Sequence, residues 1–377
     1  MLPGGNDTLY RSVLGAGHRR FVRIDVYSGN GILLNSMIPQ PLQGDPEGGL
    51  CFLNGSVSAT LTSRVARTLT LSVPESLYPN KTTDLLAPFG NEIRAYLGVT
   101  LGDGNTGYSW PVFRGKIRTV TKTSGGDCQI YCGDRANEVL DVAFASPENS
   151  QPANLVFSEF QRLVAGALAD ATFGPSDTFL KRVEALTWEF DRGSALDEIA
   201  RSVGALWYPL ANGDFVLRVI PWTIASPPVL TLTDQAGGTV NAWMRSRSRE
   251  QIFNVVTVTG ERLNGDAPVF ATATDNNVLS PTFVGGNFGV KSVVERLQTP
   301  ATQGGAQTTA ETLLRNYVAP VEEWSLETVP DGALELGDVL RLLVDGVDVT
   351  QVVTGFSLPL DLSGNMSVST RSLVVGL

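Results

Sequence analysis

Histidine, the side chain that most often carries acid–base and metal chemistry near neutral pH, occurs once in this 377-residue chain, as His18. A zinc hydrolase usually takes at least two histidine ligands, and a serine or cysteine nucleophile needs a rigidly held imidazole. His18 is followed by Arg19 and Arg20 in a glycine-rich polar segment, residues 1–20, that we expect to be a mobile arm. The sequence therefore assigns no catalytic, cofactor-binding or metal-ligating residue and predicts that the chain is not an enzyme.

Carboxylates are the one other group that could catalyse hydrolysis here, because a glycosidase needs only two of them. Residues 147–235 contain a pool of acids: Glu159, Glu184, Glu189, Asp191, Asp197 and Glu198. Carboxylates at helix caps and on helix faces are normally solvated, which is the simpler interpretation. A peptidoglycan-degrading glycosidase that uses this pool stays open as the alternative function.

The cysteines and one acidic loop give weak metal signals. Cys51, Cys128 and Cys132 are odd in number and widely spaced, so no disulfide framework is indicated. Cys128 and Cys132 share one face of an expected strand, where two buried thiols are favoured over a metal site. Asp103-Gly-Asn-Thr-Gly107 lacks the ligand spacing and closing glutamate of a calcium loop and is interpreted as a hairpin tip.

Charge and aromatic content limit the possible partners. With a net charge of −10, the chain has no means of gripping nucleic acid, although it could line a passage through which DNA moves. Three arginines, Arg245, Arg247 and Arg249, alternate with serine and either face an acidic neighbouring subunit or form a solvated strand end. A carbohydrate-binding adhesin would expose aromatic residues such as Trp188, Trp207 and Trp222, which we expect to be mostly buried.

Cellular location follows from the apolar runs. No stretch of 18 or more apolar residues is present, so we expect no membrane insertion. The basic residues at the N-terminus follow the few apolar ones, which is the wrong order for a signal peptide. We therefore expect synthesis and folding in the cytoplasm.

The fold class is predicted to be mainly β with an α+β insert. Apolar residues alternate with polar ones through most of residues 52–134, which is typical of half-buried antiparallel strands separated by glycine and proline turns. Residues 147–235 instead show two amphipathic helices, capped by Ser158 and Ser194, and a hairpin with an Asn212-Gly213 turn. The expected domains are an arm (1–20), a first β-barrel module (21–146), the insert (147–235) and a second β-barrel module (236–377).

The two β modules share landmarks in the same order. Gly90-Asn-Glu-Ile-Arg-Ala-Tyr-Leu97 aligns with Gly337-Asp-Val-Leu-Arg-Leu-Leu-Val344, and Val112-Phe-Arg-Gly115 aligns with Val352-Val-Thr-Gly355. Leu71-Ser-Val-Pro74 aligns with Glu327-Thr-Val-Pro330, and turn glycines follow at Gly125 and Gly364. Either one chain carries two copies of a β module, or the match reflects the glycine turns that any two β-meanders share.

Three stretches carry a resemblance to a known family. They are Ser63-Arg-Val-Ala-Arg-Thr-Leu-Thr-Leu-Ser-Val-Pro74, Leu85-Leu-Ala-Pro-Phe-Gly-Asn-Glu-Ile-Arg94 and Gly133-Asp-Arg-Ala136. These stretches resemble minor tail proteins of actinobacterial siphophages and, more broadly, the baseplate or tail-tip hub family of tailed phages. The segment Glu335-Leu-Gly-Asp-Val-Leu-Arg341 is similar to the closing β module of that family.

The resemblance implies a structural virion protein at the tail tip, with no cofactor. In that family, two tube-like barrels in each of three subunits form a pseudo-sixfold ring that caps a hexameric tail tube. The implied partners are two further copies of the chain, the tail tube or distal tail protein, and a spike, fibre or other tail-tip protein, with DNA only in passage. Since the chain ends at Leu377 without a fused hydrolase, any wall-degrading activity is expected from a separate protein.

Overall fold

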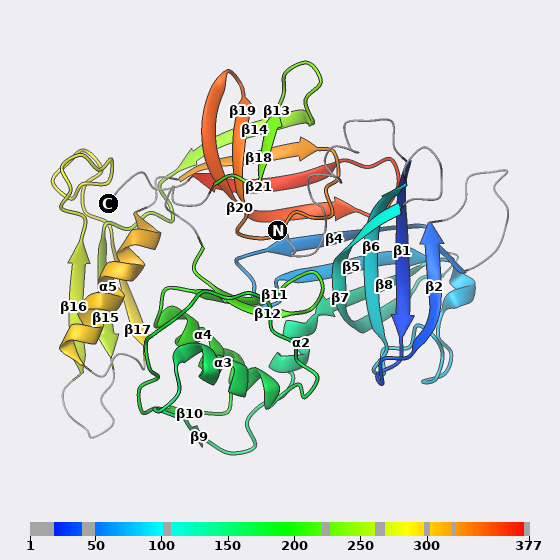
Figure 1. The fold of residues 1–377 in the computed structure, drawn as a ribbon, viewed down its shortest axis with the longest axis horizontal. Coiled ribbons are helices and arrows are strands. Elements are labelled where there is room, and N and C mark those ends of the chain that lie inside the picture. Colours follow the sequence, from blue (N-terminus) through cyan, green and yellow to red (C-terminus); the bar gives the residue numbers. More distant parts are fainter. Residues whose placement is uncertain are drawn as a thin grey trace.

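A computed structural model describes residues 19–39, 50–100, 107–124, 126–220, 227–260, 268–297, 302–318 and 321–372. Most of its regular elements are strands, which confirms the prediction of a mainly β chain (Figure 1). The N-terminal strands are β1 (Arg19–Tyr27), β2 (Leu33–Pro39), β3 (Leu50–Phe52), β4 (Asn54–Thr60), β5 (Arg67–Val73), β6 (Glu92–Thr100), β7 (Gly107–Lys122) and β8 (Cys128–Asp134). A short 3-10 helix, η1 (Glu75–Leu77), follows β5.

The C-terminal part supplies six more strands to the same sheet. They are β13 (Leu230–Thr233), β14 (Val240–Ser248), β18 (Val321–Thr328), β19 (Val339–Val344), β20 (Val347–Pro359) and β21 (Met366–Ser372). Over the described residues the sheet runs β14-β18-β21-β20-β4-β5-β8-β7-β6-β1-β2-β3, with β19 beside β20 and β13 beside β19. One continuous apolar core lies along it, from Ile24 on β1 to Val368 on β21.

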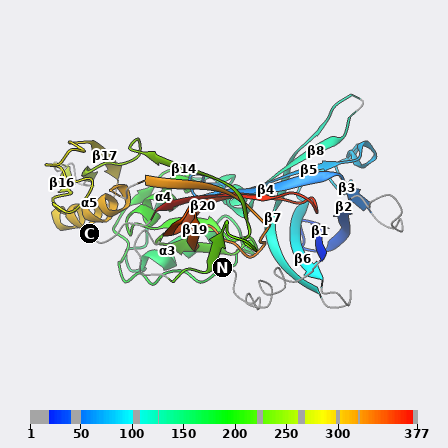
Figure 2. The same ribbon diagram turned by 90° about the horizontal axis from the view of Figure 1, so that it is seen from above.

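This strand path does not close, so the expectation of two closed barrels is not confirmed. The reason is that β20, from the C-terminal part, pairs with β4, from the N-terminal part, and joins them into one sheet. Figure 2 shows this sheet edge-on, with β1–β3 at the opposite end from the helix near the C-terminus.

The segment between the two groups of strands forms a small α+β unit. It contains α2 (Arg135–Leu140), β9 (Glu148–Asn149), α3 (Val156–Ala165), β10 (Thr187–Trp188), α4 (Arg192–Arg201), β11 (Leu206–Pro209) and β12 (Phe215–Arg218). Its own core includes Phe160, Leu163, Leu196 and Phe215. The strand β13, although it lies within residues 147–235, pairs with β19 in the main sheet.

Both predicted helix caps in this unit were wrong. Helix α3 begins at Val156 without a side-chain cap, and α4 is capped by Asp191, whose side chain accepts a hydrogen bond from the Gly193 amide. Ser158 and Ser194 therefore lie inside the first turns. The Asn212-Gly213 hairpin turn is confirmed, because β11 and β12 pair around Gly213, which has a φ of +89°.

A third unit interrupts the second group of strands, between β14 and β18. Strands β15 (Val255–Gly260), β16 (Val269–Thr274) and β17 (Ser292–Leu297) form a separate sheet covered by α5 (Gln303–Tyr317). The sequence predicted a strand at 251–259 and a short helix at 308–317, but treated residues 264–305 as a loop or extended hairpin. Strand β17 pairs in parallel with β15, a connection that local alternation does not reveal.

Candidate functional site

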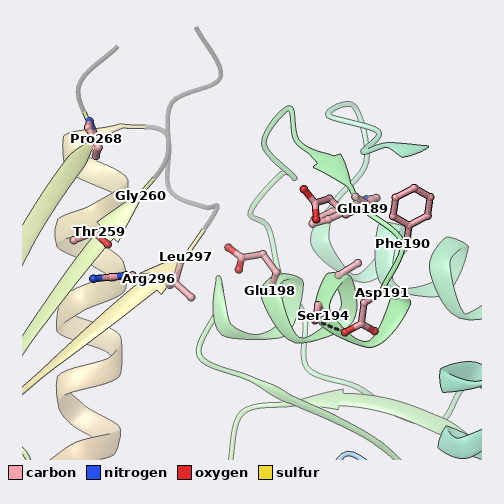
Figure 3. A pocket seen from close by; sticks show the side chains of 12 residues that line it. Glu189, Phe190, Asp191, Ser194, Glu198, Thr259, Gly260, Pro268, Arg296 and Leu297 are labelled. Atoms are coloured by element: carbon pink, nitrogen blue, oxygen red, sulfur yellow. Dashed lines mark hydrogen bonds between the residues drawn. The ribbon is translucent and has the colours of Figure 1, made fainter. Parts of the chain in front are cut away.

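An open cleft of about 680 Å³ lies between the α+β unit and the ends of β15 and β17 (Figure 3). Three acids of the predicted pool line it: Glu189, Asp191 and Glu198. Glu198 projects from α4 across the gap toward the end of β17, where Arg296 also lines the cleft. Glu159, Glu184 and Asp197 are not among the lining residues, so the structure brings only half of the pool together.

Asp191 has a structural task at this cleft. Its carboxylate accepts hydrogen bonds from the Gly193 amide (2.9 Å) and from the Ser194 hydroxyl, and Arg64 lies 3.4 Å away. The hydrogen bond from Ser194 is the main cause that holds the pKa of Asp191 below its usual range, against the opposing effect of partial burial. Asp191 is therefore an ionised helix cap, whereas the general acid of a glycosidase needs a raised pKa.

Glu159 is also held as an anion, inside the α+β unit. It is fully buried and accepts hydrogen bonds from Asn154 (3.1 Å), Arg162 (2.8 Å) and the Trp188 indole (3.2 Å). Burial by itself would raise its pKa, but these bonds and the charge of Arg162 outweigh burial and lower it. Asp197 likewise accepts from the Trp207 indole at 2.8 Å. These contacts position helices α3 and α4.

Arg245 and Arg247 on β14, and Arg249 just after it, have partners within the chain. Arg245 and Arg247 both bind Glu322 on β18, and Arg245 also lies over the Trp324 ring, 5.0 Å from its centroid. Burial opposes ionisation of Glu322, but hydrogen bonds from the two arginines lower its pKa overall. Arg249 instead donates to the Phe288 carbonyl at 3.2 Å. Two of the three guanidinium groups thus share one carboxylate of the neighbouring strand.

The remaining predicted site residues are buried or lie outside the described residues. Trp188 and Trp207 are buried, as are Cys128 and Cys132, whose side chains join the main core. His18, Trp222, Gly125 and the loop residues Asp103–Thr106 are not among the described residues. Over the described ranges, no three or more His, Cys, Asp or Glu side chains gather as metal ligands. No helix in those ranges is both long and apolar enough to cross a bilayer.

The feature that does stand out is a repeated order of strand pairing. We call β1, β4, β5, β6, β7 and β8 the first strand module and β13, β14, β18, β19, β20 and β21 the second. In the first module the pairing order is β4-β5-β8-β7-β6-β1, and in the second it is β14-β18-β21-β20-β19-β13. Each strand thus has a counterpart at the same place in chain order and in the sheet. The modules differ at one pair, since β1 is antiparallel to β6 but β13 is parallel to β19.

Residue registers agree with this correspondence. Gly90 (φ +111°) and Gly337 (φ +81°) each precede a strand that starts two residues later. Glu92, the first residue of β6, pairs with Lys116, and Val339, the first residue of β19, pairs with Val352. The register also shifts just beyond these partners, between Ile117 and Thr119 in β7 and between Val353 and Gly355 in β20. Lys116 therefore corresponds to Val352.

Two of the sequence alignments need correction in this frame. Thr119 is the first residue after the register shift in β7, and Gly355 is the first residue after the shift in β20. Gly355 therefore corresponds to Thr119, four residues beyond the Gly115 with which the sequence had aligned it. Leu71 pairs with Ile130 on β8, and Leu326 pairs with Val368 at the corresponding position of β21. Leu71 therefore corresponds to Leu326 and not to Glu327. Glycine marks a turn or a bulge in both modules, but not always the same one.

The two modules are joined by a strand pair and a buried ion pair. Strand β20 pairs antiparallel with β4 from Gly355–Thr60 to Pro359–Ser56. Nearby, the Arg67 guanidinium of the first module binds the Glu335 carboxylate of the second, and both side chains are 1% exposed. Glu335 also accepts the Ala211 amide of the α+β unit at 3.2 Å. One carboxylate therefore connects three parts of the chain, which the sequence did not reveal because residues 67 and 335 are far apart in it.

Comparison with known proteins identifies the fold. No protein-family model matches the chain, and no curated protein matches its sequence. Among solved structures, a tail protein from Neisseria meningitidis MC58 is similar over 94% of this chain and 97% of its own, with a TM-score of 0.64 and 14% identity. The 43 kDa tail protein of prophage MuSo2 from Shewanella oneidensis is similar over 93% and 98%, with a TM-score of 0.59 and 12% identity.

A third similar structure is the Francisella PdpA–VgrG complex. One of its chains is similar to 97% of this chain over 60% of its own length, with a TM-score of 0.51 and 10% identity. The expected likeness to phage tail proteins is therefore confirmed at the level of the fold. The likeness to actinobacterial siphophages in particular stays a prediction.

Proposed function

We propose that this chain is a structural hub of a phage or phage-derived tail tip, where three copies join the tail tube to a spike or fibre. The single observation that carries the proposal is the repeated pairing order of the two strand modules within one sheet. A tail tube of six subunits meets six similar surfaces when three copies of a two-module chain form a closed ring. A ring built from one repeated head-to-tail contact needs such similar units.

The fold comparisons support the same proposal. Two prophage or bacterial tail proteins share the fold across nearly the whole of both chains. The third similar structure is a complex of PdpA with VgrG, and we extend a spike-type partner to this chain as part of the proposal. The remaining proposed partners are the tail tube or distal tail protein, and the site of action is the virion after assembly in the host cytoplasm.

The net charge of −10 suits a passage for DNA. A wall that carries negative charge repels phosphate, so DNA in transit would not bind to it. We therefore include lining of the DNA channel in the proposed role.

The proposal is tested by symmetry. The chain, alone and co-expressed with its neighbouring tail proteins, is measured by native mass spectrometry over a range of concentrations and by electron microscopy of particles. We expect a species of about 121 kDa, three times the 40.3 kDa chain, and threefold density at the tip. A chain that stays monomeric in both samples, together with a tip that lacks threefold density, would exclude the hub.

The alternative, a glycosidase, is favoured only by the position of Glu189, Asp191 and Glu198 around one cleft. Zymography on host cell wall separates the two functions, because a hub alone gives no clearing. Clearing by the wild-type chain that is lost in both Glu189→Gln and Glu198→Gln would establish the hydrolase instead. The matched control is Glu184→Gln, an acid of the same unit that does not line the cleft.

A further inference from the structure

The contact between the two modules is made on one edge of β20. Strand β21 occupies one edge of β20 over residues 351–357. On the opposite edge, β19 pairs with residues 347–352 and β4 then pairs with residues 355–359. Backbone hydrogen bonds extend this joint at both ends, from the Leu61 amide to the Thr354 carbonyl and from the Leu360 amide to the Gly55 carbonyl, each 2.9 Å. Strand β4 therefore pairs with the part of this edge of β20 that β19 leaves unpaired, and we call this contact the internal joint.

The corresponding edge of β7 has no strand beside it among the described residues. On one edge of β7, the pairing with β8 continues as far as Lys122. On the other edge, the pairing with β6 stops at Lys116. Residues 118, 119, 121 and 122 are exposed, and Val120 is half-buried. Residues 118–122 of β7 thus correspond in position and register to the part of β20 that pairs with β4.

The strand that would complete the correspondence is β14, the counterpart of β4. It is the outermost strand at its end of the sheet and pairs, within the described ranges, only with β18. Most of its residues are exposed, including the large side chains of Trp243 (41%) and Met244 (63%). An exposed edge strand with apolar side chains usually marks a surface that pairs with another chain.

We infer that β14 of one copy pairs antiparallel with residues 119–122 of β7 in the next copy, and so repeats the internal β20–β4 joint between subunits. Transferring the internal register gives the pairs Thr119–Ser248, Val120–Arg247, Thr121–Ser246 and Lys122–Arg245. The inference rests on the proposed function and deepens it by naming the contact that builds the ring. Because the described part of each copy presents one free edge of each kind, the contact is head-to-tail, as a closed ring requires.

One pair in this register places like charges opposite each other. Lys122 faces Arg245, but Lys122 is held 2.6 Å from Glu75 and Arg245 is bound to Glu322 within their own copies. Glu322 also binds Arg247, which lies opposite Val120 in this register, so the five groups together carry a net charge of +1. The backbone ladder between the edges supplies the attraction, as it does in the internal joint.

The register predicts which cysteines will join. In the internal joint the Leu61–Thr354 pair is hydrogen-bonded, so by alternation Ser58–Ser357 is a non-hydrogen-bonded pair, and Ser246–Thr121 corresponds to it. Side chains are closest at such pairs, which suits a disulfide. We therefore test Thr121→Cys with Ser246→Cys. The background carries Cys51→Ser, since Cys51 is half-buried whereas Cys128 and Cys132 are buried.

The expected result is a covalent ladder up to a trimer on a non-reducing gel, in the purified chain or in assembled tail particles. The matched control pairs Thr121→Cys with Asn241→Cys, an exposed residue of the same strand about 17 Å along it from Ser246. We expect at least tenfold less cross-linking in the control. Equal cross-linking in both pairs, or none for the in-register pair in either sample, overturns the inference.

A second measurement uses the backbone alone. By the same alternation the Arg247 amide points away from β18 toward the free edge, so Arg247→Pro removes a hydrogen-bond donor that only the neighbouring copy would use. We expect Arg247→Pro to lose the trimer and Arg247→Ala to keep it. A trimer in both variants overturns the strand pairing but leaves the hub intact. A wild-type chain that is monomeric in every sample and absent from the tip removes the hub itself.

Discussion

Replacing Glu335 by alanine should lower the free energy of unfolding by about 4–6 kcal/mol. Glu335 and Arg67 are each 1% exposed and bind each other. Removal of one partner leaves the other charge buried without compensation, which costs about 3–5 kcal/mol. The Ala211 amide, which donates to Glu335 at 3.2 Å, also loses its acceptor, and a net hydrogen bond adds about 1 kcal/mol.

The assay is urea unfolding followed by tryptophan fluorescence, with hydrogen exchange at β4 and β20 to locate the loss. The Arg67→Met/Glu335→Leu double variant replaces both charges by apolar groups and should recover most of the stability. Asp348→Ala, which breaks the exposed Arg341–Asp348 pair, is the control and should leave the midpoint nearly unchanged. A loss below about 1 kcal/mol for Glu335→Ala, or a double variant no better than the single one, would refute the reasoning.

Two further predictions concern buried contacts. Burial raises the pKa of Asp134 to about 7, against backbone hydrogen bonds from Arg67 and Ala136 that favour the anion. The stability that protonated Asp134 contributes should be fully present below about pH 4 and should be lost as pH rises through 7, by up to about 4 kcal/mol. Urea unfolding midpoints measured against pH should show this slope, and Asp134→Asn should flatten it. Gly204 has a φ of +66°, and a Cβ there would lie 2.4 Å from a Thr312 methyl on α5. Gly204→Ala should therefore cost about 2–3 kcal/mol by calorimetry, with partial recovery in Gly204→Ala/Thr312→Ala, and equal losses in both variants would contradict the clash.

Local features of the fold were predictable from sequence where a single segment carries the signal. Alternating side chains gave the strands of the first module, and the apolar stripe through Phe160 and Leu163 gave the core face of α3. Gly90 and Gly337 were found as landmarks because positive φ is costly for other residues, and both positions have it. The acids around the cleft were predicted as a group from the sequence. Which of them line one cleft depends on how α4 is placed relative to β17, and this was not predictable.

Long-range features were not predictable from one sequence. Period-two alternation shows that β20 is a strand but not that β4 is its neighbour, since the pattern is the same for any partner. For the same reason closure into two barrels was expected where the structure has one continuous sheet. The alignment of Gly115 with Gly355 failed by four residues because a glycine signals backbone freedom and not register.

The two modules show why such a fold can persist while its sequence changes. Leu69 and Trp324 occupy corresponding core positions and are both buried, but they differ in side-chain type. Val57 on β4 corresponds to Arg245 on β14, where even the polarity differs. The pairing order survives because a β ladder is made by backbone amides and carbonyls, which every residue except proline supplies. The same reasoning accounts for 14% identity to the Neisseria tail protein over 94% of this chain. At the proposed contact between copies, substitutions along β14 should therefore be tolerated unless they remove an outward amide, which makes proline the informative change there.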